Sequence, residues 1–401
     1  MIALLACVQP VLTELPEPEP DPGPQVVLDD QIETAPDFPQ VDVFSDLSIH
    51  PWSIDLSSNA LSSLRNNPRE WAPATFVVGE VAYEIGLRIK GTSTAQGIDY
   101  KPSLKLAFDH VYEGQRFYGL RRLNLHNMTL DPILSSEVLT WDIFRSAGLP
   151  APRVGYARLS IEGEDRGLFS VVEDIEDDFL KQWFSDSGGN LYENAKNYCD
   201  LTAISCFDRE EDDEGNDDAL YELIESASLS GEAWGSAMQT LWDWERFVGF
   251  MAMERTIAHW DSYSFDLSNY RLYHEPTADR WTFIPWSGDL GFGYRPWSYP
   301  ECGKHGVDPT GYDMGRLASA CQEDERCRDD VMDRMLEFAD LVEEMGGGQL
   351  VLDALDRVRA DAATDPEHRS EMDHFEAHGA CVASFLDERP EIVREWVAEN
   401  R

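Results

Sequence analysis

Basic residues are scarce in this chain, which has 32 Lys and Arg against 76 Asp and Glu and a net charge of −44 over 401 residues. Binding nucleic acid through its phosphates, or docking on an anionic membrane by charge, requires a basic face, so the composition argues against both. The acidic balance is compatible with attracting divalent cations or basic protein segments, and also with solubility alone, which is the simpler interpretation. No internal run is long and apolar enough to span a bilayer.

The chain also lacks a CxxC pair, the spacing that a zinc site would favour. Among its seven cysteines, Cys7 ends the sequence Leu-Leu-Ala-Cys, which has the form of a bacterial lipobox whose cysteine is lipidated. The other six make an even set, which an exported compartment would allow to pair as disulfides. Their spacing predicts two local loops, Cys199–Cys206 and Cys321–Cys327, and the rest of the pairing, which involves Cys302 and Cys381, stays open.

The N-terminal part divides into a lipobox remnant, residues 1–7, and an acidic, Pro-rich tether, residues 8–45. Residues 1–7 are too short for a signal peptide, and the first basic residue is Arg65, so the lipobox interpretation places the true start upstream. The tether contains TELPEPEPDPGP, a composition that cannot bury a core. We expect a bacterial lipoprotein outside the cytoplasm, held at the cell envelope only through a lipid on Cys7.

Residues 46–174 are expected to form a strand-rich lobe. The stretch TFVVGEVAYEIGLRIKG joins β-branched and aromatic residues around a turn, and KPSLKLAF alternates so that Lys105 lies on the face away from the leucines. A Gly/Ser/Thr loop, residues 91–97, separates the two stretches. A helix then opens after Asp131-Pro132 and ends at Gly148.

Residues 175–401 are expected to form a helix-rich lobe. A long amphipathic helix is predicted from Trp242 to His259, and further helices follow Asp308. No internal repeat is present. The predicted fold class is therefore α+β, with a strand-rich lobe followed by a helix-rich lobe.

The stretch that begins at His259, HWDSYSFDLSNYRLYHEPTADRWTFIPWSGDLGFG, carries three residues suited to a metal–phosphate site. Asp261 follows a helix, Asn269 opens the strand NYRLYH, and Asp289 follows the apolar strand RWTFIPW. A loop acid directly after a buried strand is held rigidly at the junction of the lobes. We therefore expect both acids and Asn269 to converge on one site.

Phosphoryl transfer requires a loop over the phosphates, a Lys on them, a carboxylate at the acceptor hydroxyl, and an acid and an amide oxygen on the metal. The chain supplies these in order, because residues 91–97 can wrap a phosphate, Lys105 follows on a strand, and Glu137 lies on the next helix in position to pair with that Lys. Each residue alone has a plainer explanation: an exposed strand Lys, a turn, or a first-turn helix acid. The order and the division between two lobes support the joint hypothesis.

These stretches resemble the CotH kinase family, named for spore coat protein H, whose members are exported proteins with an atypical protein-kinase-like fold. The motifs are RIKGTSTAQGIDYKPSLKLAF (88–108), residues 120–163 and 166–180, HWDSYSFDLSNYRLYHEP (259–276) and WTFIPWSGDLGFG (281–293). The resemblance covers about residues 80–400.

The resemblance implies a two-lobed protein-kinase-like fold that transfers the γ-phosphate of ATP, with Mg²⁺ or Mn²⁺, to Ser or Thr of an exported protein. We expect a monomer. Asp261 would act at the acceptor hydroxyl, and Asn269 and Asp289 would hold the metal. Lys105 would hold the phosphates and Glu173 would lie at the hinge beside adenine. The implied nucleotide-binding set is Gly91, Thr92, Ser93, Lys105, Glu137 and Glu173.

Two departures from the family pattern bear on activity. Ser287-Gly288 stands where the family often carries an Asp after the Trp, and Lys90-Gly91-Thr92 stands where Arg-Gly-Asn is usual. They leave open a catalytically degenerate kinase fold that serves as a surface binding, adhesion or structural module. A glycosidase with paired carboxylates fits the acid-rich, Trp-rich composition but explains neither Lys105 nor the glycine-rich loop.

The lipobox interpretation predicts how the protein fractionates. Expressed from its full native start, the protein should partition with membranes, and Cys7→Ser should release it, because the lipid on Cys7 is its only expected anchor. Membrane fractionation followed by immunoblotting measures this. Wild-type protein found wholly in the soluble fraction after export would contradict the anchor.

Overall fold

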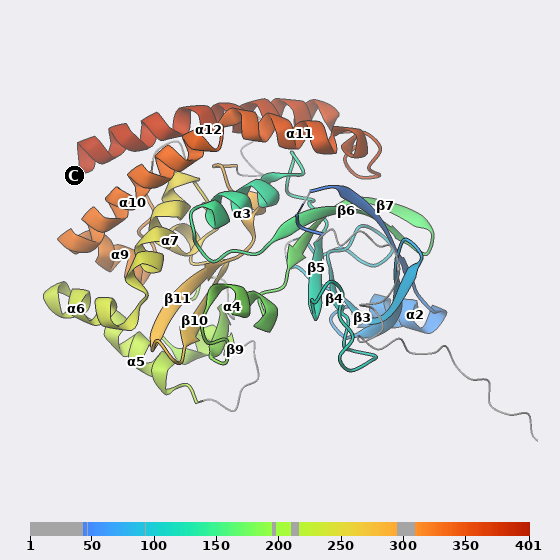
Figure 1. Ribbon diagram of the computed structural model, residues 1–401, viewed down its shortest axis with the longest axis horizontal. Coiled ribbons are helices and arrows are strands. Elements are labelled where there is room, and N and C mark those ends of the chain that lie inside the picture. The colour runs from blue at the N-terminus through green and yellow to red at the C-terminus, as the bar shows by residue number, and fades with distance from the viewer. Residues whose placement is uncertain (1–42, 46, 93, 195–197, 210–215, 295–308) are drawn as a thin grey trace, which may run out of the picture. The chain divides into compact units, whose positions relative to one another are not determined.

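The computed structural model describes residues 43–45, 47–92, 94–194, 198–209, 216–294 and 309–401, which all belong to one compact unit, residues 38–401 (Figure 1). The lipobox remnant and nearly all of the predicted tether lie outside the described residues. Within the described part of the chain, no helix is long and apolar enough to cross a membrane.

Seven strands form a closed barrel in the order β1-β2-β3-β4-β5-β7-β6. Their bounds are Ile49–Asp55 (β1), Ala72–Val78 (β2), Val81–Ile89 (β3), Leu104–Ala107 (β4), Arg122–His126 (β5), Val154–Ile161 (β6) and Glu164–Glu173 (β7). Strand β1 closes the barrel, since it pairs antiparallel with β2 and parallel with β6. One helix, α2 (Ser58–Asn66), joins β1 to β2.

Side chains alternate between the barrel interior and its outer face. Leu87, Leu106 and Leu125 belong to the apolar interior cluster. Arg88 of β3 lies opposite Lys105 of β4 in the strand register, and Asn124 of β5 lies opposite Lys105 on the other side. These polar residues share the outer face. This confirms the expected alternation, and it places a polar strip on the outside of β3, β4 and β5.

The second part of the fold is built around helices and a small four-stranded sheet in the order β11-β10-β8-β9. Its strands are Asn190–Asn194 (β8), Phe207–Arg209 (β9), Tyr270–Glu275 (β10) and Arg280–Pro285 (β11). Its helices are Asp177–Trp183 (α4), Asp218–Ala227 (α5), Gly231–Leu241 (α6), Trp244–Thr256 (α7), Tyr263–Asp266 (α8), Arg316–Glu323 (α9), Glu325–Glu344 (α10), Gly348–Ala362 (α11) and Met372–Asn400 (α12), with short 3₁₀ turns at Ile204–Cys206 (η1) and Gly288–Leu290 (η2). The predicted α+β class, with a strand-rich part followed by a helix-rich part, is thus confirmed.

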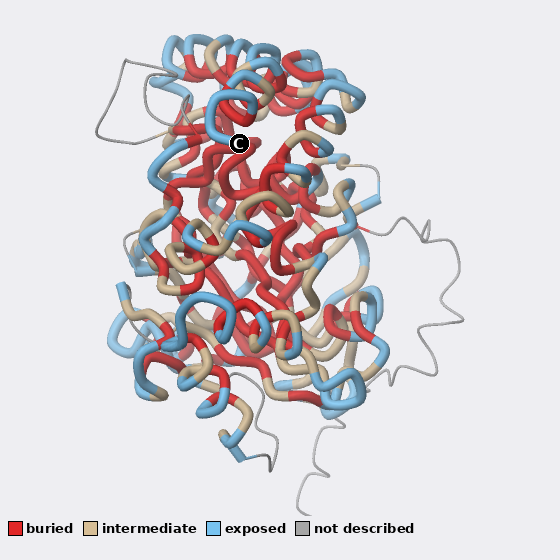
Figure 2. Tube along the Cα trace, turned by 90° about the vertical axis from the view of Figure 1, so that its left-hand side faces the viewer, coloured by how far each residue is buried: buried red, intermediate tan, exposed pale blue. Residues whose placement is uncertain are grey.

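Helix α3 (Ser136–Ser146) follows β5 and precedes β6 in the chain and packs in the second core, against η2, β6 and α11. The helix predicted from Trp242 to His259 is shorter, Trp244–Thr256, and it is not amphipathic, because every residue from Phe247 to Thr256 is buried. Burial on all sides makes α7 part of the interior of this core. Figure 2 shows buried segments running through the middle of the molecule and exposed ones around its outside.

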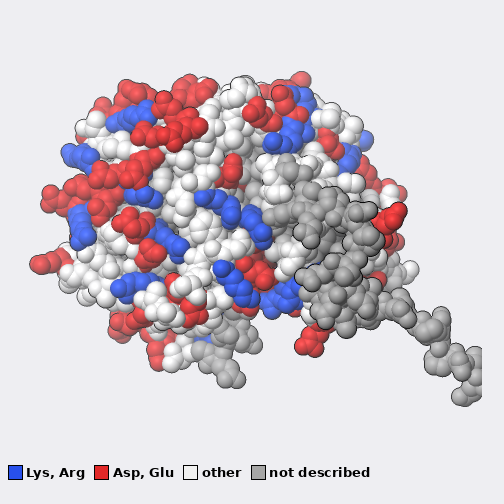
Figure 3. All heavy atoms as spheres, in the orientation of Figure 1, with Lys and Arg blue, Asp and Glu red and all other residues white. Residues whose placement is uncertain are grey.

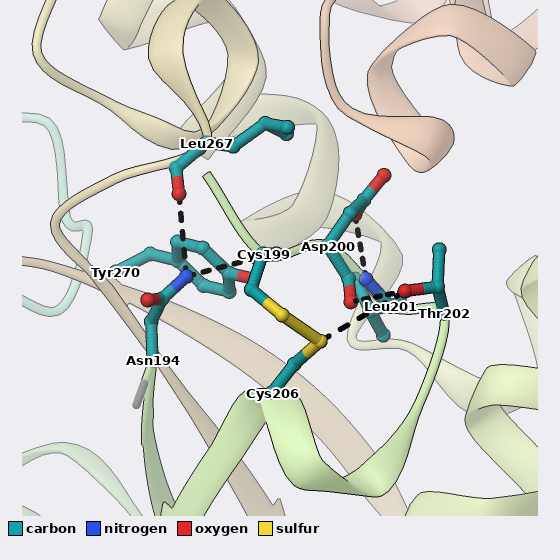
Figure 4. The surroundings of a disulfide bond; sticks show 8 residues. All are labelled: Asn194, Cys199, Asp200, Leu201, Thr202, Cys206, Leu267 and Tyr270. Carbon is teal, nitrogen blue, oxygen red and sulfur yellow. Dashed lines mark hydrogen bonds between the residues drawn. A yellow bond between two sulfur atoms is a disulfide. The ribbon is translucent and has the colours of Figure 1, made fainter. Parts of the chain in front are cut away.

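Two disulfides close the predicted local loops, Cys199–Cys206 and Cys321–Cys327, and both pairings are confirmed. Cys381 is also disulfide-bonded, whereas Cys302 lies outside the described residues. The first disulfide lies within the connection from β8 to β9, between Cys199 and Cys206 at the end of η1, and Figure 4 shows Asn194 bonded both to Cys199 and to Leu267, in the segment before β10. The Asn194 side-chain amide donates to the carbonyl oxygens of Cys199 (2.9 Å) and Leu267 (3.2 Å).

The barrel is attached to the connection between α11 and α12 by a buried ion pair. Lys101 Nζ lies 2.8 Å from Asp365 Oδ2, and the side chains are 2% and 0% exposed. The same Asp365 oxygen accepts from the backbone N–H of Leu168 on β7 at 2.7 Å. A second, more exposed pair nearby joins Arg158 to Asp361 at 3.0 Å.

These two ion pairs make a matched test of burial. Asp365→Ala should lower the free energy of unfolding by about 3–5 kcal/mol, because Lys101 is left buried and uncompensated. Asp361→Ala should cost less than about 1 kcal/mol, since Arg158 stays in contact with solvent. Urea unfolding of both variants measures the difference, and equal losses would contradict a stabilising role for the buried pair.

Candidate active site

A cavity of about 520 Å³ lies between the polar outer strip of β3–β5 and the loops that flank β10 and follow β11. Its size is typical of a site for a small molecule or cofactor. On the face shown in Figure 3, several Lys and Arg side chains gather near the middle of the molecule, while many acidic side chains lie toward its left and upper edges. The predicted site residues that line the cavity are Gly91, Thr92, Lys105, Glu137, Asp261, Asn269 and Asp289.

Asp261 and Asp289 come together at this cavity. Burial raises the pKa of Asp261 to about 7, and repulsion from the carboxylates of Asp289 and Asp266 adds to the shift. The Asn269 amide donates to the backbone carbonyl of Asp261 at 2.8 Å. The structure therefore places the three residues of the predicted metal–phosphate site side by side, while their roles stay predictions.

The Asp261 loop is held by a buried acid that the sequence analysis missed. Glu254 on α7 accepts from the backbone N–H groups of Tyr263 (3.2 Å) and Ser264 (3.1 Å), at the start of α8. Burial raises the pKa of Glu254 to about 8. These bonds satisfy donors at the first turn of α8 and so fix the backbone two residues beyond Asp261.

The disulfide loop supports the same segment from the other side. Asp200, next to Cys199, accepts from the Tyr263 hydroxyl at 3.1 Å and from the backbone N–H of Arg316 at 2.7 Å. The Tyr270 hydroxyl donates to the Cys199 carbonyl at 3.1 Å (Figure 4). The loop that carries Asp261 and Asn269 is therefore attached at both of its ends.

The turn that carries Asp289 packs tightly against α3. Thr140 Oγ1 donates to the Gly288 carbonyl at 2.9 Å, and a Cβ at Gly288 would lie 2.9 Å from Thr140 and Trp141. A Cβ at Gly291 would lie 2.7 Å from Thr140 Oγ1. The glycine of Ser287-Gly288, a departure from the family pattern, is thus required by the approach of this helix.

His259 connects the two acid-bearing loops. Its Nε2–H donates to the Ser287 carbonyl at 3.0 Å, and burial lowers its pKa to about 4, so the ring is neutral. The Ser287 hydroxyl in turn donates to Asp289 Oδ1 at 2.9 Å. The sequence analysis had no role for His259, which here fixes the Asp289 turn relative to the Asp261 loop.

The expected pair between Lys105 and Glu137 does not form. Lys105 Nζ lies 2.6 Å from Asp174 and 3.5 Å from Glu176 instead. Burial acts to raise the pKa of Asp174, but Lys105, together with a hydrogen bond from Glu176 and the charge of Arg271, outweighs it and holds that pKa below its usual range. The reason is strand order, because β7 and not α3 lies next to β5, and Asn124 of β5 donates to Asp174 at 2.9 Å.

Glu137 is engaged by other residues. His126 Nδ1 lies 2.9 Å from its carboxylate, and the Ser170 hydroxyl donates to it at 2.7 Å. On the other side of the imidazole, Lys90 Nζ lies 2.7 Å from His126 Nε2. Burial lowers the pKa of Lys90 to about 7. Glu137 on α3 is thus connected through His126 to a lysine of the cavity, and this lysine is Lys90.

Glu173 does not line the cavity, contrary to the expected place beside adenine. Its carboxylate accepts from the Arg153 guanidinium at 2.7 Å and from the Arg153 backbone N–H at 3.0 Å. Phe169 and Val171 face the barrel interior, so alternation along β7 points Glu173 away from the site and Asp174 toward it. That alternation is visible in the sequence. Ser93 lies outside the described residues.

The side chains present fit a hard divalent cation. No three His, Cys, Asp or Glu side chains of the described residues are grouped to hold a metal by themselves. Asp289 and Asn269 offer a carboxylate and an amide oxygen, and Mg²⁺ commonly takes one or two such ligands and completes its shell with phosphate oxygens and water. A cation there would also offset the repulsion between Asp261 and Asp289.

A model of the CotH kinase protein family matches residues 87–340, and the chain belongs to that family. Among individual relatives, the inner spore coat protein H of Bacillus subtilis is 19% identical over 349 residues, which cover 81% of this chain and 91% of that protein. Invasin CotH2 of Rhizopus delemar is 28% identical over 189 residues, 42% of this chain and 32% of the invasin, so the chain spans about a third of that relative.

Solved structures with some likeness include the Helicobacter pylori proinflammatory kinase CtkA, with 12% identity, a TM-score of 0.31, and coverage of 74% of this chain and 94% of the other. The HipA protein of Shewanella oneidensis, in a complex with HipB and operator DNA, gives 11% identity, a TM-score of 0.38, and coverage of 77% and 68%. Scores of this size carry no argument about fold or activity.

The raised pKa of Asp261 predicts a pH-dependent stability. Its folded-state pKa of about 7 exceeds the value of about 4 expected for an unfolded chain, so without a divalent cation stability falls as the pH rises from about 4 to about 7. At pH 8, Asp261→Asn should therefore raise the free energy of unfolding by something of the order of 2–4 kcal/mol, and the gain should vanish near pH 4.

Urea unfolding in EDTA at several pH values measures this effect. Asp55→Asn, on the exposed side of β1, is the matched control and should change little at any pH. A gain that is the same at pH 4 and pH 8 would show that the stability change has another origin.

Proposed function

We propose that the protein is an active kinase that transfers the γ-phosphate of ATP to Ser or Thr of an exported protein, with Mg²⁺ or Mn²⁺. The observation that carries this proposal is the meeting of Asp261, Asn269 and Asp289 at one cavity, opposite a wall that carries Lys90 and Lys105. Acids and an amide on one side and cations on the other suit a metal-bound polyphosphate.

In the proposed mechanism, Asp261 accepts the proton of the acceptor hydroxyl as its oxygen bonds to the γ-phosphorus and the bond to the leaving ADP oxygen breaks. A pKa of about 7 suits a general base at neutral pH. Asp289 and Asn269 would hold the metal ion, which neutralises charge on the phosphates when bound. Gly91, with φ of +91°, and Thr92 would cover the phosphates with backbone N–H groups.

We further propose that the protein acts outside the cytoplasm, anchored through Cys7, as a monomer on an exported protein substrate. The disulfides support an oxidising compartment. The relatives named as a spore coat protein and as invasins are consistent with a surface location.

The second candidate is a surface binding or adhesion module that has kept the fold without the chemistry. The names of two relatives, invasins CotH2 and CotH3 of Rhizopus delemar, favour it. A measurement of phosphoryl transfer distinguishes the two candidates, because a binding module would transfer no phosphate and would not need Asp289 as a metal ligand.

Asp289→Asn tests the metal site. Incubated with ³²P-ATP and Mg²⁺ or Mn²⁺, wild type should label itself or an exported protein, and the variant should be slower by about 100-fold or more, as when one preorganised electrostatic group is removed. The rise in melting temperature that Mg²⁺–ATP gives to wild type should also be lost.

The matched control is Asp279→Asn, at an exposed turn between β10 and β11 with φ of +53°, which should keep both the activity and the thermal shift. If Asp289→Asn labels and shifts as wild type does, Asp289 is not a metal ligand. If wild type shows neither labelling nor a nucleotide shift, the binding module is the better account.

A further inference from the structure

The polar strip on the outer face of the barrel is ordered in rows across the strands. Arg88, Lys105 and Asn124 form one row, because β3 pairs Arg88 with Lys105 and β5 pairs Asn124 with Lys105. The next outward-facing row lies two residues beyond Arg88, directly after β3, and contains Lys90. The Lys90 backbone N–H donates to the Ser103 carbonyl at 2.9 Å, which continues the pairing of β3 with β4. Lys90 and Lys105 thus occupy different rows of the same wall.

The row of Lys90 is the one that faces the Asp289 turn. Trp286, at the end of β11 and three residues before Asp289, lies with its ring 4.7 Å from Lys90 Nζ and its centroid 5.7 Å from that of His126. The charges of Glu137 and His126 both act on the carboxylate of Asp289. A phosphate bound to a metal at Asp289 would therefore meet the row that contains Lys90.

The two lysines differ in how their charges are already compensated. Lys105 has two carboxylates within ion-pair distance, Asp174 at 2.6 Å and Glu176 at 3.5 Å. No carboxylate of the described residues forms an ion pair with Lys90, whose Nζ lies 2.7 Å from the imidazole Nε2 of His126. An anion at Lys105 has to compete with Asp174, whereas an anion at Lys90 would meet an amine that has no carboxylate in ion-pair contact, and the anion would itself favour the protonated form of that amine.

The imidazole leaves the ammonium of Lys90 able to bind a phosphate. With Glu137 accepting from His126 Nδ1–H, Nε2 is the acceptor for one N–H of Lys90. An ammonium group has three N–H donors, so two stay available on the cavity side. The chain from Glu137 through His126 therefore orients Lys90 without consuming its charge.

We propose that Lys90 is the residue that contacts the β- and γ-phosphates of the nucleotide at the metal, and that Lys105 serves to hold Asp174 in place. This inference rests on the proposed function, because it takes the ligand to be a metal-bound nucleoside triphosphate. It assigns the phosphate contact to a lysine at the start of the glycine-containing loop, one row away from the strand lysine that the sequence singled out.

The test compares affinities for ATP and ADP, each with Mg²⁺, and for AMP, by calorimetric titration of the full chain. Lys90→Met should weaken ATP and ADP binding about 10- to 100-fold, as expected for a lost hydrogen-bonded charge, and change AMP binding less than about 3-fold. Lys90→Arg, which keeps the charge, should recover most of the ATP affinity.

Lys105→Met and Lys181→Met are the comparison variants. Lys105→Met should lower the melting temperature, because it removes the cation that pairs with the buried Asp174, while Glu176 keeps its pairs with Arg121 and Arg122. The ratio of AMP to ATP affinity should stay as in wild type. Lys181 is an exposed lysine on α4, so Lys181→Met should change neither property.

The outcomes separate this inference from the proposed function. Wild type that binds ATP, with Lys90→Met binding it equally well, overturns the role of Lys90 and leaves the proposed function intact. Loss of the ATP preference in Lys105→Met alone assigns the contact to Lys105. Wild type that binds no nucleotide contradicts the proposed function and this inference together. If Lys90→Met does not fold, Lys90→Gln gives the same comparison.

Discussion

The carboxylates of Asp261 and Asp289 repel each other across a partly buried cavity, and the surrounding structure has to hold them there. Glu254 and Asp200 fix the loop of the first acid, while Thr140 and the neutral His259 fix the turn of the second. Because like charges in a low-dielectric site favour separation, each of these contacts opposes a drift of the loops apart. The neighbouring residues therefore preorganise the site, because its two acids do not attract each other.

Helix α3 joins the two parts of the fold at this point. It begins next to the barrel, where Glu137 meets His126, and one turn later Thr140 and Trp141 press on Gly288. The helix therefore relates the cationic wall to the acidic turn through a rigid element. Gly288 belongs to this packing, since a Cβ there would lie 2.9 Å from Thr140 and Trp141.

Local patterns in the sequence predicted a large part of this arrangement. Alternation placed Lys105 on the outer face of its strand, and a buried strand followed by an acid placed Asp289 at the edge of the cavity. Local patterns could not predict that Lys105 pairs with Asp174. The pairing requires β7 to lie next to β5, and a local pattern does not determine which strands of a sheet are neighbours. The contact of Lys90 with Glu137 through His126 joins three separate segments and has no local pattern at all.

The closed barrel limits how the cavity can change shape. Every barrel strand has hydrogen-bonded neighbours on both sides, so the wall that β3, β4 and β5 form has no free edge along which it could open. A large ligand that enters or leaves has to displace the loop after β3 or turn the barrel as one rigid body against the helices. Because the buried pair of Lys101 and Asp365 also joins the two parts, a motion of the second kind would have to turn about that contact or break it.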